Sequence, residues 1–222
     1  LWQVLLEGTV RQAAVADANG LYVVTTTGLV VALDFAGKER WRQQLTREDN
    51  GLPKRVEAPM AVFQDALLVA SMCGHVHALD AATGPVVLTV YGRVRKPNAG
   101  SAAQFDMAML EQLPQHSFVT RTPWYSTPRK FTGPLLRDVL SACGAMGSNL
   151  RATALNDYRV DLPFEDTQRF DVLLARLLDD KPMAVRDKGP LFIIYPFDSS
   201  AELRTTVYFS RSAWQLKSLE VQ

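Results

Sequence analysis

Residues 21–34 read LYVVTTTGLVVALD, and the same pattern returns at residues 67–80 as LLVASMCGHVHALD. Each copy has an apolar run, a glycine, a second apolar run and a closing aspartate. Short apolar runs bounded by turn residues are typical of buried strands, and the central glycine favours a tight turn. Each copy therefore predicts a pair of antiparallel strands, followed by a turn that begins at the aspartate: Asp34–Gly37 in one copy and Asp80–Gly84 in the other.

A further strand is expected after each turn, at Trp41 in the first copy and in the apolar residues 86–90 in the second. A repeat of four short strands with a following Trp resembles the blade of a quinoprotein-type β-propeller. The resemblance covers residues 2–88 and amounts to two blades. Propellers usually close with about four to eight blades, so two blades leave a strand edge unpaired. We expect this edge to pack on the rest of the protein or to contact another chain.

Composition excludes several classes of protein. The chain has 222 residues, of which 47% are hydrophobic, so it can bury a core. Its formal net charge of +1 argues against a dedicated nucleic-acid binder. No apolar run approaches the roughly 20 residues of a membrane-spanning helix. Two cysteines without a CxxC motif exclude a disulfide scaffold and a zinc module. Because the chain starts at Leu1, we expect that a signal peptide or a larger N-terminal portion has been removed.

The residues after the repeats predict a second domain, with the division at residues 1–86 and 87–222. The formal charge changes from −2 in the first segment to +3 in the second, a mild basic bias that suits an anionic small molecule and is too weak for DNA. Apolar spacing predicts short helices at 105–113, 135–143 and 165–174. Strands are expected at 88–94, 118–122, 150–156, 160–163, 191–195, 207–209 and 215–221. Together these elements predict a mixed α+β domain.

Polar and aromatic residues gather in four loops of this second segment: 120–125, 156–158, 186–196 and 210–214. Exposed aromatic rings, guanidinium groups and one carboxylate suit a flat, polar heteroaromatic ligand. Other interpretations stay open. Trp124 and Trp214 equally fit a core or its rim, and an Asn-Asp pair is also a common turn signal. Arg186 and Asp187 equally fit a surface ion pair.

Residues 131–140, FTGPLLRDVL, resemble a segment of sulfite-oxidase-fold domains, which bind molybdopterin. Residues 154–158 (ALNDY), 188–196 (KGPLFIIYP) and 214–221 (WQLKSLEV) are similar to later parts of that family. The resemblance covers nearly all of residues 87–222. It implies a sulfite-oxidase-like α+β domain, preceded by the all-β segment of about two blades.

One departure from that family bears on chemistry. Its enzymes ligate molybdenum with a cysteine, but residues 117–124, SFVTRTPW, contain none, and Thr120 lies near the ligand position. A neutral hydroxyl is a poor replacement for a soft thiolate. His75 and His77 have no evident third ligand, so we expect no metal site. A cysteine-less branch of the same fold is similar to this segment, and it contains periplasmic pterin-binding sensors that act on a membrane-bound cyclic-di-GMP enzyme or sensor kinase.

The resemblance thus implies a periplasmic or secreted pterin-binding sensor without catalytic residues, with a pterin as ligand and such a membrane receptor as partner. Trp124 or Tyr158 would stack on the ring, and Asp157 would bind the amino-pyrimidine edge. The ligand-binding residues are expected to be Thr120, Arg121, Trp124, Asn156, Asp157, Tyr158, Tyr195 and Arg211. One alternative is a molybdenum-cofactor oxidoreductase, with the metal held by the dithiolene and oxygen ligands. A second is a pure interaction protein in which both segments are scaffolding.

Overall fold

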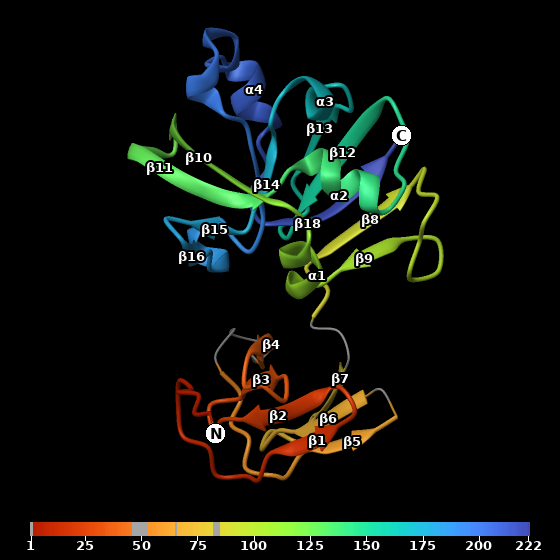
Figure 1. The fold of residues 1–222 in the computed structure, drawn as a ribbon, viewed down its shortest axis with the longest axis vertical. Coiled ribbons are helices and arrows are strands. Elements are labelled where there is room, and N and C mark those ends of the chain that lie inside the picture. Colours follow the sequence, from red (N-terminus) through yellow and green to blue (C-terminus); the bar gives the residue numbers. More distant parts are fainter. Residues whose placement is uncertain (1, 46–52, 65, 82–84) are drawn as a thin grey trace. The chain divides into compact units, whose positions relative to one another are not determined.

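The computed structural model describes residues 2–45, 53–64, 66–81 and 85–222 (Figure 1). The chain divides into two compact units, Leu1–Pro85 and Val86–Gln222. No described helix is both long enough and apolar enough to cross a membrane.

The first unit begins with a four-stranded antiparallel sheet whose strands follow chain order. Its strands are β1 (Val15–Asp17), β2 (Gly20–Val24), β3 (Leu29–Leu33) and β4 (Glu39–Gln44). The turn between β2 and β3 needs Gly28, whose φ is +79° and where a Cβ would lie 2.3 Å from the carbonyl oxygen of Lys54. Asp34 closes the next turn, because its Oδ1 accepts hydrogen bonds from the N–H groups of Ala36 and Lys38. The predicted strand pair and both turns of the first copy are confirmed.

The second copy of the repeat forms a three-stranded antiparallel sheet. Its strands are β5 (Ala61–Phe63), β6 (Ala66–Ala70) and β7 (Val76–Asp80). The turn between β6 and β7 places Gly74 at a φ of +82°, so the second predicted strand pair and its glycine turn are also confirmed. The turn expected at Asp80–Gly84 includes residues 82–84, which lie outside the described residues. The strand expected at 86–90 belongs to the second unit, where it is β8 (Leu88–Gly92). Among the described residues, the second sheet of the first unit therefore ends at β7.

The two sheets of the first unit share one apolar core. Tyr22 and Trp41 from the first sheet pack in one cluster with Leu67 and Val69 from the second. The buried Tyr22 hydroxyl donates a hydrogen bond to the carbonyl oxygen of Ala81, 2.7 Å away. The two repeats are therefore stacked face to face, as neighbouring propeller blades are.

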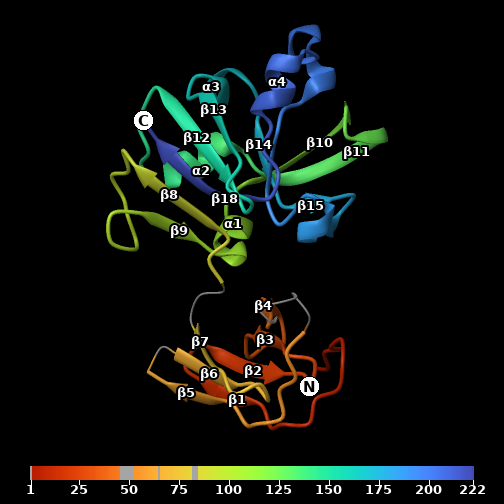
Figure 2. The same cartoon turned by 180° about the vertical axis from the view of Figure 1, so that it is seen from behind.

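The main sheet of the second unit has the order β13-β12-β18-β8-β9 (Figure 2). Its strands are β13 (Arg159–Pro163), β12 (Asn149–Ala154), β18 (Leu216–Val221), β8 (Leu88–Gly92) and β9 (Ala103–Phe105). β18 pairs with β8 in parallel, whereas the other pairs are antiparallel. The last strand that the structure describes therefore lies at the centre of this sheet.

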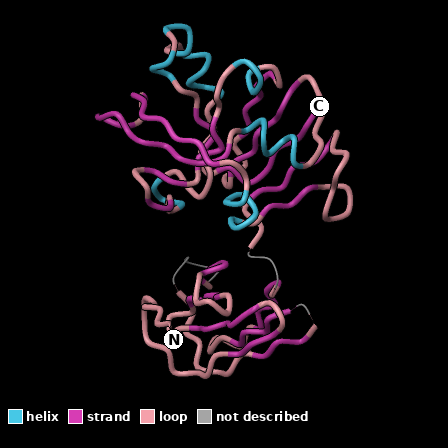
Figure 3. Tube along the Cα trace, in the orientation of Figure 1, coloured by secondary structure: helices cyan, strands magenta, loops and turns pink. Residues whose placement is uncertain are grey.

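Smaller sheets and short helices complete the second unit (Figure 3). The remaining strands are β10 (Gln115–Thr122), β11 (Tyr125–Pro134), β15 (Leu177–Leu178), β16 (Lys181–Pro182), β14 (Leu173–Ala175) and β17 (Phe192–Ile194). The α-helices are α1 (Met107–Gln112), α2 (Leu136–Ala142), α3 (Asp166–Arg169) and α4 (Thr206–Arg211), and three 3-10 turns are η1 (Val185–Asp187), η2 (Phe197–Ser199) and η3 (Ala201–Leu203). One core of buried apolar side chains joins these elements, and α2 contributes Leu136, Val139 and Leu140 to it.

The predicted fold class, an α+β sulfite-oxidase-like domain, is wrong, because the described residues are mostly β. Their four α-helices span only four to seven residues each. The helix expected at 165–174 ends at Arg169, since Leu173–Ala175 pairs with β17 instead. The strand expected at 207–209 is part of α4, so packing there overrides the β propensity of Val207 and Tyr208.

We predict that Leu67→Ala destabilises the first unit by about 2–5 kcal/mol, because it removes a fully buried side chain from the core that joins the two sheets. Urea unfolding followed by Trp fluorescence measures the change. Leu5→Ala is the matched control, since Leu5 is 97% exposed and its truncation leaves the free energy of unfolding nearly unchanged. Equal effects of the two substitutions would contradict the shared core.

Candidate functional site

A pocket of about 440 Å³ opens in the second unit beside α4. Three segments line it: the turn between β10 and β11, the turn between β12 and β13, and α4 with the residues that follow it. The lining residues are Trp124, Ala154, Asn156, Tyr158, Phe209, Ser210, Ser212, Ala213 and Trp214. The volume lies within the range of small-molecule sites.

Aromatic rings form the wall of this pocket. The ring of Trp124 lies 5.4 Å from that of Trp214, centroid to centroid, at an interplanar angle of 69°. The ring of Phe209 meets Trp124 edge to face, 6.3 Å away. The Lys188 ammonium lies 4.7 Å from the centre of the Trp214 ring, which places a positive charge behind it. Edge-to-face packing holds these rings in fixed orientations.

The polar residues of the pocket are tied to the backbone. Asn156 accepts a hydrogen bond from the backbone N–H of Tyr158 through Oδ1, which fixes the turn that carries both. The Ser210 hydroxyl donates to the carbonyl oxygen of Val207, and the Ser212 hydroxyl donates to that of Tyr208. These contacts fix the rim of the pocket.

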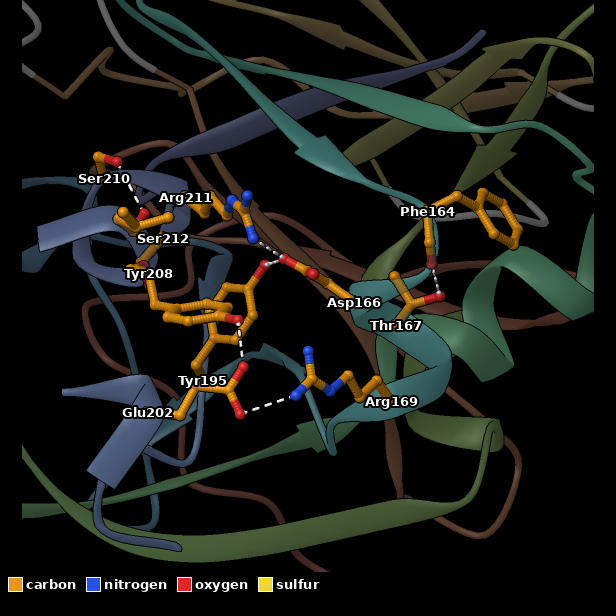
Figure 4. Close-up of polar contacts among 11 residues, drawn as sticks. Phe164, Asp166, Thr167, Arg169, Tyr195, Glu202, Tyr208, Ser210, Arg211 and Ser212 are labelled. Atoms are coloured by element: carbon orange, nitrogen blue, oxygen red, sulfur yellow. Dashed lines mark hydrogen bonds and ion pairs between the residues drawn. The ribbon is translucent and has the colours of Figure 1, made fainter. Parts of the chain in front are cut away.

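A buried ion pair anchors the helix that carries part of this lining (Figure 4). Asp166 of α3 accepts two hydrogen bonds on the same oxygen, at 2.8 Å from the Arg211 guanidinium and at 2.7 Å from the Tyr195 hydroxyl. The side chain of Asp166 is only 9% exposed. Burial, followed by the hydrogen bond to Asp166, raises the pKa of Tyr195, so its hydroxyl remains a donor throughout the physiological range.

A second carboxylate extends this network. Glu202 accepts one hydrogen bond from the Tyr208 hydroxyl at 3.1 Å and one from Arg169 at 2.8 Å (Figure 4). Tyr208 belongs to α4, and Arg169 belongs to α3. The two networks therefore join α3 to both ends of the segment 202–211.

Three of the eight residues predicted to bind ligand line the pocket: Trp124, Asn156 and Tyr158. Tyr158 is 57% exposed, so part of its ring is open to solvent. Asp157, which lies between Asn156 and Tyr158 in the same turn, is outside the lining and pairs with Lys217. The hydrogen bond from Lys217 lowers the pKa of the Asp157 carboxyl.

The other four predicted residues also lie outside the lining. Tyr195 is fully buried, and Arg211 is directed at Asp166. Thr120 is buried as well, and its hydroxyl oxygen accepts the backbone N–H of Asp198. Arg121 is exposed, and its backbone N–H donates to the Asp198 carboxylate.

Sequence reasoning missed Phe209, Ser210, Ser212 and Trp214 as lining residues. The sequence indicates a polar and aromatic loop at 210–214, but of its residues only Arg211 is predicted to bind ligand. The strand expected at 207–209 accounts for Phe209, because a helix presents different residues to one side than a strand does. Ser212 and Trp214 follow the end of α4, and from the sequence Trp214 equally fits a core or its rim. The ion-pair partner Asp166 was expected only as part of a helix start.

The second repeat carries a separate group of titratable residues. The Lys54 ammonium lies 3.3 Å from Nε2 of His77, and the Cys73 thiol lies 3.1 Å from the Ser71 hydroxyl. The hydrogen bond to Ser71, then one to His75, lowers the pKa of Cys73 to about 7. No group of three metal-ligating side chains occurs among the described residues. The expectation that the protein binds no metal stays a prediction.

Comparison with known proteins concerns the first unit. Residues 1–54 match the family model for the outer membrane protein assembly factor BamB. Over 86 residues, the chain is 34% identical to the outer membrane protein assembly factor BamB of Kangiella koreensis. That alignment covers 38% of this chain, and the chain spans only 21% of the relative's length. The resemblance of the repeats to β-propeller blades is supported.

These matches correct the function expected from the sequence. They favour a BamB-like repeat of the outer-membrane-assembly type, and the pterin-binding sensor is therefore wrong, as are its molybdopterin and oxidoreductase alternatives. A pterin, a cyclic-di-GMP enzyme and a sensor kinase gain no support as partners. The Thr120 hydroxyl, expected near a metal-ligand position, is instead occupied by the backbone of Asp198.

We predict that Arg211→Met lowers the free energy of unfolding by about 3 kcal/mol, because it leaves the Asp166 carboxylate buried without its cation. Chemical unfolding of the second unit measures the loss. Arg186→Met is the matched control, since the Arg186 side chain is 88% exposed in its pair with Asp187, and its cost is about 0.5 kcal/mol or less. A small effect at both positions would show that the ion pair does not anchor α4.

Proposed function

We propose that residues 1–85 form a protein-binding module of a periplasmic, outer-membrane-associated assembly protein. The observation that supports this function is the match of the first repeat to the BamB family, extended by 34% identity over 86 residues. Stacked blade-like repeats commonly serve as interaction surfaces, because each repeat leaves faces and edges for a partner.

The second sheet offers the surface for such a partner. Phe63 of β5 is 66% exposed and Val76 of β7 is 68% exposed. Leu68 of β6 lies directly opposite Ala61 of β5 and Ala78 of β7. Residues opposite each other share one face of a sheet, so these three add apolar surface to the same face. We call the side of β5–β6–β7 that carries these five residues the outer face of the second sheet.

The first sheet shows how such a face is normally covered. Its own outer residues Leu29, Val31 and Leu33 are buried, and Val4 and Leu6 from the N-terminal segment pack against them. No equivalent segment of the first unit is described on the second sheet. An apolar segment of a partner protein that packs on this face, as Val4 and Leu6 do on the first sheet, would cover it, and a strand of the same partner that pairs with β7 would extend the sheet at its edge.

We predict that Phe63→Asp with Val76→Asp weakens partner binding at least about tenfold, because charges on the outer face must be desolvated on docking. Photo-crosslinking from positions 63 and 76 in the periplasm, followed by mass spectrometry, identifies the partner. Position 35 is the control, since Phe35 is 61% exposed in a turn of the first sheet. Equal adducts from all three positions, or adducts lacking outer-membrane assembly proteins, would contradict the proposal.

For the second unit, we infer that the pocket beside α4 binds a small aromatic molecule. Its aromatic wall and its volume of about 440 Å³ support this role. Trp124, Asn156 and Tyr158 would contact the ligand. Thr120, Arg121, Asp157, Tyr195 and Arg211 would hold the surrounding segments in place, through the contacts to Asp198, Lys217 and Asp166.

We predict that Tyr158→Ala weakens binding of an aromatic probe by about tenfold, because a stacking ring contributes roughly 1–3 kcal/mol. Indole and adenine serve as probes, with affinity measured by chemical-shift titration of ¹⁵N-labelled protein. Tyr91→Ala is the control, as Tyr91 lies on β8 outside the pocket lining. Unchanged affinity in Tyr158→Ala, or no binding of either probe, would place ligand binding elsewhere.

A further inference from the structure

A second hollow of the same unit shares no lining residue with the aromatic pocket. It is a groove of about 520 Å³ that runs beside α2 and the turn after β8, elements that Figure 2 shows near one another. Its polar lining comprises Arg95, Lys96, Arg137, Asp138, Ser141 and Gln168. Its apolar lining includes Leu140, Met146 and Phe164. We call it the basic groove, since its lining contains three cations and one carboxylate, and Arg137 is the cation among them that pairs with a carboxylate outside the lining, Asp171.

The three cations of the groove differ in whether a carboxylate already neutralises them. Arg137 pairs with Asp171 at 2.8 Å, as many other basic residues of residues 86–222 pair with a carboxylate. Arg95 and Lys96 are exposed, and neither forms an ion pair with any described residue. Arg93, two residues earlier, is likewise exposed and unpaired within the described chain. Two uncompensated positive charges, Arg95 and Lys96, thus line one end of the basic groove, and Arg93 adds a third close by in the sequence.

The backbone holds these charges in place. The N–H of Lys96 donates to the carbonyl oxygen of Cys143 at 3.0 Å, and the N–H of Arg95 donates to that of Gly144 at 3.2 Å. Both acceptors lie just after the end of α2. Cations are favoured near a helix C-terminus, which explains their location. The attraction between these cations and the end of α2 is weak and is screened by salt, so the Arg95 guanidinium and the Lys96 ammonium can still bind an anion from solution.

We propose that the basic groove binds a phosphate group that is attached to an apolar body. A phosphate monoester carries between one and two negative charges near neutral pH, and Arg95 and Lys96, which have no described ion-pair partner, supply two positive charges to meet it. The Ser141 hydroxyl and the Gln168 amide add neutral hydrogen-bond donors along the same wall. Met146 is 53% exposed and lies beside them, so the groove offers an apolar surface next to its charges.

The Arg and Lys side chains and the apolar wall make separate contributions that can be tested with two probes. Phenyl phosphate carries both the phosphate and an apolar ring, whereas inorganic phosphate carries only the charge. We expect the full chain to bind phenyl phosphate more tightly, and Met146→Ser to remove that preference while leaving inorganic phosphate unchanged. Chemical-shift titration of the residues of α2 and of residues 93–96 measures both affinities.

The charge contribution is tested with Arg95→Gln/Lys96→Gln. This variant should bind phenyl phosphate at least about tenfold more weakly, because it removes two charge-assisted contacts. Arg204→Gln is the matched control, since Arg204 is also exposed and has no described ion-pair partner but lies outside the groove. Wild-type affinity in the double variant, an equal loss in the control, or no binding of phenyl phosphate to the unaltered chain would overturn the proposal.

A phosphate with an apolar body occurs both in small phosphate esters and in lipid headgroups. Vesicles of phosphatidylcholine with and without phosphatidylglycerol separate these two sources in a co-sedimentation assay. Binding that requires phosphatidylglycerol and is lost in Arg95→Gln/Lys96→Gln assigns the groove to a lipid surface. Binding of phenyl phosphate without vesicle binding assigns it to a soluble ester. Vesicle binding that survives in the double variant counts against the groove.

Discussion

One carboxylate oxygen determines where the pocket of the second unit can form. Oδ2 of Asp166 receives both the Arg211 guanidinium and the Tyr195 hydroxyl, and so connects α3, the end of β17 and α4. The helix carrying Arg211 also carries Phe209 and Ser210 to the pocket wall. A polar contact of this kind contributes little net stability when fully formed, yet an unpaired charge at the same place would be costly. It therefore selects one position for α4 more than it strengthens the fold.

In the first unit, the equivalent constraint is apolar. The two copies of the repeat form one sheet each, and these two sheets pack one face against the other. The N-terminal segment covers the second face of the first sheet. The second sheet keeps an exposed apolar face and ends at β7 in the described chain. A repeat architecture makes this asymmetry natural, since each repeat relies on its neighbour for burial. This exposed face is the surface that we propose binds a partner protein.

The sequence predicted the first unit better than the second, for physical reasons. In the repeat, the glycines at 28 and 74 and the apolar runs around them all indicate the same hairpin, and both adopt positive φ. In the second unit, local signals compete with packing. Val207 and Tyr208 favour a strand but form a helix, and Leu173 and Leu174 favour a helix but pair with β17. Trp124, Asn156 and Tyr158 could be chosen because loops expose them. Phe209 could not be chosen without α4, and no local pattern distinguishes Trp214 in a pocket wall from Trp214 in a core or reveals that Arg211 is directed at Asp166.

The position of β18 has a consequence for biosynthesis. This strand is the last described element, yet it lies between β12 and β8 and is hydrogen-bonded to both. The paired residues of β8 and β18 are 129 residues apart in the chain, as Thr89 and Ser218 show. During translation, the five-stranded sheet therefore cannot close until Val221 has left the ribosome exit tunnel. The described strands of the first unit have no such long-range pairing, so this unit can fold while the second is still being made. A nascent chain stalled shortly before residue 216 would therefore display a finished pair of repeats followed by open strand edges, which is the state in which a chaperone would be most needed.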